Sequence, residues 1–511
     1  MIQKQTRSKK QLTTLIVCAV LFAILLPVYF IFVQPLLDEV LSEKEPPELM
    51  EGEILGANNR ILMFEHVEKA DILSIEVHNE HGSYTFYRGD DDAFYIKGME
   101  GAPYSLEMLS SLVVSSGYTL SMKRLDDLND DLSVYGFGED DDPAWYVLTK
   151  MDGTKHKVLI GDMIPTGGGY YCMYEGRRAV YVLDTSLSAT LLADIHSLIT
   201  PSLSLPVSTT TYTKVDDFTI IKNGELLVAI DMLTAEETGS EDGLMDYVFK
   251  YPKKYSPNLS TYSAIMEMMG SFAGLETVAC GSDLEKLDET MMKETYGIDI
   301  ENPYFMLSYS VEDLDCIIAF SKPDEDGMMY AYSTVYNLVA KVDLATANFI
   351  NWGLLQYVDP PLFAENINDI AKIEIKGNIE NGDEKLDVGA YFTLEGEGET
   401  IVIKQNGGAK PYDADGVKTF RQLYKVMLGI RLQDYAEVTD FEGKEPFAEM
   451  IITDDKGEAT EYKFYIYSTR RCFYTINGVG EFYVLRDNVE KLLRDTDRMV
   501  NGLPIDSDAK T

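Results

Sequence analysis

Val180-Tyr-Val-Leu-Asp184 has the pattern of a β-strand that ends in an aspartate, and the chain carries three versions of it. The other two are at residues 339–343 and 483–487. Two further landmarks precede each version in the same order, a proline that opens a strand-like run and a second run rich in aromatic residues. The prolines are Pro143, Pro303 and Pro446, and the aromatic runs are centred on Cys172, Ala331 and Cys472. Because all three landmarks keep nearly constant spacing, they predict three copies of one structural unit.

Each copy shows the same order of expected elements. Alternating apolar and polar residues, as in 72–78 and 370–376, predict half-buried strands. Helices are expected at 105–116, 259–272 and 416–428, and turns at 151–154 and 454–457. Closing helices are expected to begin at aspartates that act as N-caps, Asp184, Asp343 and Asp487.

These elements predict an α+β fold with three tandem related units, each an antiparallel or mixed sheet with packed helices. The expected boundaries are 60–205, 206–362 and 363–511, and the middle copy is the most diverged. Short linkers are expected at 200–213 and around Asp359-Pro-Pro361.

The segment before the first unit predicts a membrane anchor. Residues 12–33 contain no charged side chain, and as a helix they would span about 33 Å, enough for a hydrocarbon core of about 30 Å. Four basic residues lie in the preceding tail, 1–11, and six acidic residues with one lysine lie between Val33 and Gly52. The positive-inside rule therefore predicts a cytoplasmic N-terminus, a transmembrane helix at 12–33, an extracytoplasmic stalk at 34–59 and extracytoplasmic units.

A cleaved signal peptide is the alternative for this segment. Signal peptides have a shorter apolar core, of about 7–15 residues, and end in a small-x-small site. The run here continues into Gln34-Pro35-Leu36-Leu37 without such a site. We therefore expect an uncleaved anchor and a single-pass protein of the cell membrane.

Composition limits the function classes. The formal charge of −41, from 85 acidic and 44 basic residues, argues against a nucleic-acid partner, because that affinity comes from Lys and Arg. A hydrophobic share of 45% is ample for packed cores.

The cysteines favour packing over chemistry. Cys172 and Cys472 occupy the same place in their copies, where the middle copy has Ala331, so the position is expected to be small and buried. Cys280 and Cys316 lie in one unit, and the sequence leaves open whether they pair. No C-x-x-C motif suggests a zinc or redox site.

Histidines and acidic residues give only weak metal signals. Glu76, His78 and Glu80 would share one face of a strand, for which a solvated face is the simpler interpretation. Calcium is suggested by acidic clusters and incomplete calcium loops at 90–92, 126–127, 130–131, 139–142, 324–327 and 413–416. None completes an EF-hand, so surface turns are expected instead. The sequence nominates no catalytic residue, no metal ligand and no cofactor.

Two further features receive structural interpretations. Residues 167–169, Gly-Gly-Gly, are expected to be a flexible hairpin tip rather than a phosphate-binding loop. The 33 tyrosines, among them Tyr170, Tyr171 and Tyr174, lie mostly in strand-like runs, although a sugar or peptide groove is an alternative.

Residues 128–192 resemble a bacterial family of unknown function. The resemblance rests on Tyr135-Gly-Phe137, Pro143, Lys157-Val-Leu-Ile-Gly161, Gly169-Tyr-Tyr171 and Val180-Tyr-Val-Leu-Asp184. It is looser in the third unit, and the middle unit retains Tyr296-Gly297 and Pro303. Such proteins typically carry one N-terminal anchor and sheet-rich repeats, and are often found beside ABC-exporter and gliding-motility-type auxiliary proteins. The resemblance implies no catalytic residues.

Three functional hypotheses follow. The first is a non-enzymatic scaffold or accessory component of an envelope complex, with protein partners that include an ABC-type transporter. The second is a module that binds envelope glycan or peptide. The third is a hydrolase with paired acids, which would need two carboxylates about 5–10 Å apart in a cleft.

The predicted topology can be tested by protease shaving of intact cells. Protease should remove the units and spare an epitope tag placed within residues 1–11, because only the part after Val33 is expected outside. Immunoblotting for both ends, with a cytoplasmic protein as the control for lysis, gives the readout. Survival of the C-terminal epitope on cells that lose a known surface protein would contradict the topology.

Overall fold

The computed structural model describes most of the chain in two compact units. The described residues are 47–56, 61–104, 106–117, 123–125, 127–185, 191–205, 215–233, 246–286, 288–311, 314–363, 365–381, 384–506 and 508. The first unit comprises the described residues of 1–97 and 106–195, and the second those of 98–105 and 196–511. Residues 98–104, which the sequence assigns to the first repeat, thus belong to the second unit.

The predicted anchor lies outside the described residues. This holds for the tail at 1–11, the helix at 12–33 and the stalk up to residue 46. Within the described part of the chain, no helix combines the length and the apolar character that a membrane span needs.

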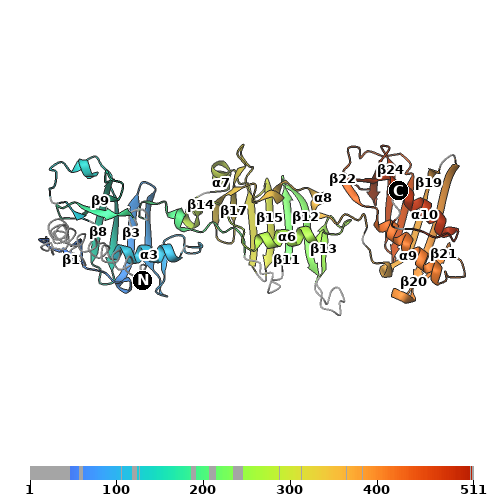
Figure 1. The fold of residues 1–511 in the computed structure, drawn as a ribbon, viewed down its shortest axis with the longest axis horizontal. Helices are drawn as coiled ribbons and strands as arrows, with labels where there is room; N and C mark the ends of the chain where they lie inside the picture. Colours follow the sequence, from blue (N-terminus) through green and yellow to red (C-terminus); the bar gives the residue numbers. More distant parts are fainter. Residues whose placement is uncertain are drawn as a thin grey trace, which may run out of the picture. The chain divides into compact units, whose positions relative to one another are not determined.

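The described residues form three eight-stranded sheets, shown in Figure 1. The first sheet comprises β3 (Ile72–Asn79), β4 (Gly82–Arg88), β5 (Phe94–Ile96), β6 (Lys123–Arg124), β7 (Ala144–Lys150), β8 (Lys155–Met163), β9 (Gly169–Tyr174) and β10 (Tyr181–Asp184). The second comprises β11 (Val215–Lys222), β12 (Glu225–Leu233), β13 (Asp246–Tyr251), β14 (Glu276–Cys280), β15 (Phe305–Val311), β16 (Leu314–Phe320), β17 (Met328–Ser333) and β18 (Leu338–Asp343). The third comprises β19 (Ile370–Asn381), β20 (Glu384–Glu395), β21 (Val402–Gln405), β22 (Leu432–Tyr435), β23 (Ala448–Asp454), β24 (Ala459–Ile466), β25 (Arg471–Ile476) and β26 (Phe482–Leu485).

All three sheets have the same strand order. The first is β5-β4-β3-β7-β8-β9-β10-β6, and the other two repeat this order strand for strand. The first strand of each repeat lies inside the sheet, between the second and the fifth, and it pairs antiparallel with the fifth, as in β3–β7, β11–β15 and β19–β23. The predicted α+β class and the repetition of sheet-rich units are confirmed, and the diverged middle copy keeps the topology. The exact boundaries of the repeats stay predictions.

One long helix lies between the third and fourth strands of each repeat. These helices are α3 (Leu106–Gly117), α6 (Leu259–Met269) and α9 (Ala414–Leu428), close to the predicted ranges. In α9 the Asp413 side chain accepts a hydrogen bond from the Gly416 amide at 2.9 Å, and Phe420, Leu423 and Met427 are fully buried. The face of a sheet that packs against its long helix is called the helix face below, and the opposite face is called the second face.

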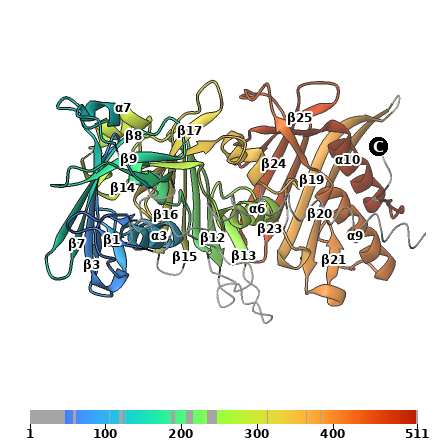
Figure 2. The ribbon, with the colours of Figure 1, turned by 60° about the vertical axis from the view of Figure 1, so that its left-hand side comes forward.

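The third sheet is covered by two helices on its helix face. Figure 2 shows α9 and α10 (Arg486–Val500) beside each other against this sheet, and α10 packs on β19 and β20. The amphipathic pattern of α10 buries Val489, Leu492, Leu493 and Met499. Shorter helices include η3 (Lys69–Asp71), η4 (Leu132–Tyr135), η5 (Ile195–Leu198), η6 (Gly281–Lys286), α7 (Glu289–Tyr296), η7 (Asn348–Asn351), α8 (Leu354–Tyr357), η8 (Ile367–Asp369) and η9 (Gly398–Thr400).

The prediction that the closing aspartates are N-caps is wrong for two of the three. β26 runs directly into α10, so that Leu485 is the N-cap and Asp487 already lies in the first helical turn. The Asp343 side chain accepts a hydrogen bond from the Ala345 amide at 2.8 Å in a turn that precedes η7. For the remaining aspartate, Asp184, the residues that follow at 186–190 lie outside the described part.

Part of the predicted stalk packs on the first sheet. Glu53 is 5% exposed, and its carboxylate accepts hydrogen bonds from the Arg124 guanidinium and the Tyr181 hydroxyl, each at 2.5 Å. Arg177 donates to the Glu51 carbonyl at 2.9 Å and to the Met63 carbonyl at 2.8 Å. Two short strands, β1 (Ile54–Leu55) and β2 (Ile61–Leu62), pair beside this network. The network therefore fixes the entry of the chain into the first unit.

Replacement of the buried carboxylate should destabilise the first unit. Glu53→Gln leaves the Arg124 guanidinium without its ionic partner in a buried site, and we expect the free energy of unfolding to fall by about 2–4 kcal/mol. Urea unfolding followed by Trp145 fluorescence in a Trp352→Phe background isolates the first unit, because the chain has only these two tryptophans.

Glu51→Gln is the matched control, since the backbone carbonyl of Glu51, not its carboxylate, meets Arg177. We expect it to change the free energy of unfolding by less than about 0.5 kcal/mol. Equal effects of the two substitutions would contradict the importance of the buried carboxylate.

Candidate functional site

The connection between the fourth and fifth strands covers part of the second face in each repeat. It carries one aromatic ring that packs on a ring of the seventh strand. The centroid distances are 4.9 Å for Tyr135–Tyr171, 5.4 Å for Tyr296–Tyr330 and 5.3 Å for Phe441–Phe473. In the second sheet α7 and η6 add a small core there, with Leu284, Met292 and Ile298. This connection is the repeated feature of the second face.

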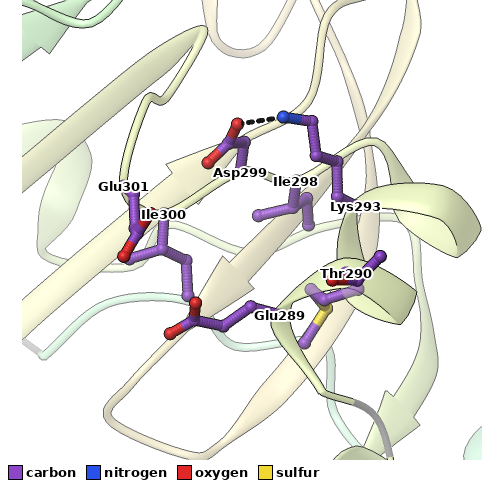
Figure 3. Close-up of a pocket in the computed structure, with 8 residues that line it drawn as sticks. Glu289, Thr290, Lys293, Ile298, Asp299, Ile300 and Glu301 are labelled. Carbon is purple, nitrogen blue, oxygen red and sulfur yellow. Dashed lines mark hydrogen bonds and ion pairs between the residues drawn. The ribbon is translucent and has the colours of Figure 1, made fainter.

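A hollow lies beside this connection in the second repeat. It has a volume of about 320 Å³ and is lined by Glu289, Thr290, Met292, Lys293 and residues 298–301. Figure 3 shows the single cation, Lys293, directed at Asp299, with an Nζ–Oδ2 distance of 2.5 Å. The hydrogen bond from Lys293 is the main reason that the pKa of Asp299 lies below its ordinary value. The ion pair therefore already neutralises the lysine, which leaves the hollow acidic.

The first repeat has a hollow at the corresponding place. It measures about 540 Å³ and is lined by Glu80, Gly136, Tyr170 and the acidic residues 140–142 and Asp162, among others. Within the described residues, no group of three or more His, Cys, Asp or Glu side chains has the arrangement of a metal site. The two hollows therefore present acidic surfaces.

A His–Asp pair is the clearest chemical constellation in the second unit. His196 Nε2 lies 2.8 Å from Asp283 Oδ2, and the same carboxylate oxygen lies 3.5 Å from the Cys280 amide nitrogen. The hydrogen bond from His196 is the main cause of the lowered pKa of Asp283. Sequence reasoning missed this pair, because 87 positions separate its members and no local motif contains both.

The cysteine beside the pair lacks the properties of a nucleophile. Cys280 is fully buried, and desolvation raises the pKa of its thiol to about 12, with Asp283 as the second cause. Nucleophilic cysteines have lowered pKa values and partial exposure.

Cys172, Cys316 and Cys472 are also buried and free, so Cys280 and Cys316 do not pair in this structure. The small, buried site predicted at Cys172 and Cys472 is confirmed, since both and Ala331 are 0% exposed.

The predicted histidine and acidic positions serve local structure. His78 stacks on Trp145 with ring centroids 5.4 Å apart, and its Nδ1 lies 2.8 Å from the Ser83 hydroxyl. β3 ends at Asn79, so Glu80 leaves the strand face that Glu76 and His78 share. The Asp324 carboxylate accepts hydrogen bonds from the amides of Asp326 and Met328, as expected for a turn.

The tyrosines of β9 do not form one groove. Tyr171 packs under Tyr135 on the second face, whereas Tyr174 pairs across the sheet with the buried Val158 on the helix face. Residues three apart in a strand face opposite ways. Gly167 and Gly168 lie in the predicted hairpin tip between β8 and β9, whereas Gly169 is already the first residue of β9.

The linkers between the repeats pair with the chain on both sides. At the first linker, the Thr200 amide donates to the Pro103 carbonyl at 2.7 Å and the Leu203 amide to the Phe272 carbonyl at 3.0 Å. At the second linker, the Asp359 amide donates to the Ser256 carbonyl and the Leu362 amide to the Ile430 carbonyl, each at 2.8 Å. In both cases the partners come from just before one long helix and just after the next. The described part of the first linker, residues 200–205, and the second linker are therefore part of the folded structure.

A buried polar cluster accompanies the second linker. The Tyr255 hydroxyl lies 2.6 Å from the Tyr474 hydroxyl and 2.5 Å from Glu481 Oε2, and Lys254 Nζ lies 2.5 Å from Glu481 Oε1. Burial is the main reason that the pKa values of both tyrosines are raised, so both stay protonated. This cluster, called the junction cluster below, ties the second sheet's repeat to the third.

Comparison with known proteins gives one match. The model of a family described as a domain of unknown function, DUF4340, matches residues 96–299. The chain is thus similar to a family of unknown function over less than half its length, from β5 to the end of the α7 connection. No significant match to a curated protein or to a solved structure is found.

The His196–Asp283 pair should contribute to stability in a pH-dependent way. Because the pKa of folded Asp283 is depressed, its contribution is present above the ordinary value of 3.8 and is lost as the pH falls through the folded value. Asp283→Asn should therefore lower the free energy of unfolding by about 1 kcal/mol at neutral pH and by much less in acid. Urea unfolding followed by Trp352 in a Trp145→Phe background measures the second unit.

Glu285→Gln is the matched control, because Glu285 lies exposed in the same short helix, η6. We expect the control to leave the free energy of unfolding unchanged at every pH. A loss with Asp283→Asn that is as large in acid as at neutral pH would contradict a role of the ionised carboxylate.

Proposed function

We propose that this chain is a non-enzymatic, single-pass membrane protein whose extracytoplasmic repeats form a scaffold or accessory component of an envelope complex. The apolar segment at 12–33 supports the anchor, and the charge on its two sides supports the orientation. The narrower form, an accessory protein of an ABC-type transporter, is supported only by the family resemblance.

The observation that carries the scaffold role is the pairing of the second linker, whose backbone bonds to both repeats that it joins. This linker holds together the second and third repeats, which belong to one compact unit, whereas a flexible linker would let them move independently. The junction cluster adds a buried contact at the second linker, with Tyr474 fully buried and Tyr255 7% exposed. A unit built in this way can present the surfaces of its second and third repeats together.

The environment of the reactive side chains supports a non-enzymatic role. The thiol nearest the His–Asp pair is buried and has a raised pKa. Lys293, the cation of the hollow in Figure 3, is already paired with a carboxylate. Both side chains are therefore better placed to stabilise the fold than to react with a substrate.

The scaffold role can be tested with the full chain in its own membrane. The chain is purified in mild detergent after light cross-linking, and co-purified integral membrane proteins are quantified per chain by mass spectrometry. We expect at least one such protein in near-stoichiometric amount. The double variant Tyr255→Phe with Glu481→Gln, which loosens the junction cluster, should lower its recovery several-fold.

Glu461→Gln is the matched control, because Glu461 pairs with Lys463 at 2.7 Å on the solvent-facing side of the third sheet, away from the junction cluster. It should leave the recovery unchanged. Circular dichroism shows whether the sheets remain folded in each variant. Purification without any integral membrane partner, or equal recovery from the double variant, would overturn the scaffold role.

A further inference from the structure

A third hollow differs from the two beside the strand connections, because it lies on the second face of the third sheet. Its volume is about 440 Å³, and the residues that line it include Glu374, Lys376, Gly389, Tyr391, Asn406 and Glu449, with Ile451 beside them. In the sheet register Lys376 is opposite Gly389 on one side and Glu449 on the other. These three positions form the middle of the hollow, called the Gly389 hollow below.

The other two sheets fill the corresponding place with side chains. Lys376 follows the buried Ile375, just as His78 follows the buried Val77 and Ile221 follows the buried Ile220. His78 is opposite Ser83 and Trp145 in the first sheet, and its ring stacks on the indole at 5.4 Å. Ile221 is opposite Leu226 and Met306 in the second sheet. The third sheet alone of these three places glycine at the equivalent of Ser83 and Leu226.

Neither backbone conformation nor packing requires glycine at position 389. Its φ lies outside the left-handed region, and a Cβ built there would meet no atom within 4 Å. By contrast, a Cβ on Gly377 of the neighbouring strand would meet the Phe447 carbonyl oxygen at 2.6 Å. Glycine inside a strand weakens the sheet and often marks the close approach of a ligand. We therefore attribute the glycine at position 389 to the hollow, whose floor it leaves open.

The charges around the hollow favour a neutral ligand. Lys376 Nζ lies 2.5 Å from Glu449 Oε2, and Lys372 Nζ lies 2.8 Å from Glu374 Oε1. An ionic ligand would have to break one of these pairs. Hydroxyl groups can instead add to them, since each carboxylate and each ammonium group keeps further hydrogen-bonding capacity.

The walls of the hollow match a sugar ring. Tyr391 and Ile451 are half-buried and offer apolar surface beside the charged pairs. The Asn406 carbonyl oxygen accepts a hydrogen bond from the Tyr391 amide at 2.9 Å, which fixes the side chain. Its Nδ2 group donates to none of the described residues and is available at the rim. A pyranose combines an apolar C–H face with a rim of hydroxyls, and a few fixed polar groups beside apolar walls are typical of such binding sites.

We propose that the Gly389 hollow binds a neutral pyranose saccharide. The C–H face of one sugar ring lies over Gly389 against Tyr391 and Ile451. Its hydroxyls donate to Glu449 and accept from Lys376 and from the Asn406 side-chain nitrogen. This site goes beyond the scaffold role and does not depend on it, because it uses the solvent-facing side of a single sheet.

The test uses the full chain in lipid nanodiscs, which avoids detergents with sugar headgroups. Saturation-transfer difference NMR is recorded with chitotriose and maltotriose as neutral probes, and with trilysine and triglutamate as ionic probes. We expect saturation of ring protons of at least one neutral probe. Gly389→Leu should weaken that binding at least tenfold, about 1.4 kcal/mol, because the leucine side chain occupies the place of the sugar.

Gly168→Leu is the matched control, since Gly168 also has open space around its Cβ but lies at the β8–β9 hairpin tip. It should bind like the unmodified chain. Tyr391→Ala, which opens the hollow instead of filling it, should weaken binding too, and thermal unfolding shows that both third-sheet variants are folded. The proposal is overturned if neither neutral probe binds, if an ionic probe binds better, or if folded Gly389→Leu binds the sugar as well as Gly168→Leu.

Discussion

The pairing of the first strand of each repeat with the fifth is the constraint on which the rest of the structure depends. In the first sheet this pairing places Ile72 opposite Lys150, and everything between them must loop out and return. The returning chain includes a long helix and a connection that crosses the other face. The helix buries one face of the central strands, and the connection buries part of the other. Such distant strands can meet only after the entropic cost of closing the long loop between them is overcome. Once they pair, the helix and the connection are held against opposite faces of the sheet, so the pairing organises both cores.

Three repeats with one strand order show which parts of the sheet tolerate change. On the helix face the residue at the equivalent of Cys172 remains small and fully buried in all three repeats. On the second face, by contrast, the equivalent of His78 is an isoleucine in the second repeat and a lysine in the third. A packed interior penalises any change of volume, whereas a solvated face does not. At these two positions the repeats agree on the helix face and differ on the second face.

Segments without a periodic pattern carry much of the long-range structure. The residues around Glu53 and the proline-containing linkers are irregular in sequence, yet their backbone or side chains bond to distant strands. Buried polar groups of this kind need partners, since a missing partner costs more than the bond contributes. The second linker thus joins its two repeats by specific hydrogen bonds.

The sequence alone determined the strands, the three long helices and the threefold repetition, because hydrophobic periodicity and landmark spacing are local properties of the chain. It misplaced the N-cap of α10, since the exact residue at which β26 becomes a helix depends on the strand's pairing. Only the tertiary structure decided which residues meet across the sheet: His196 with Asp283, Glu53 with Arg124, and Lys376 over Gly389. These contacts depend on register and on the meeting of distant segments, and a shift of one residue in register would send each side chain to the other face.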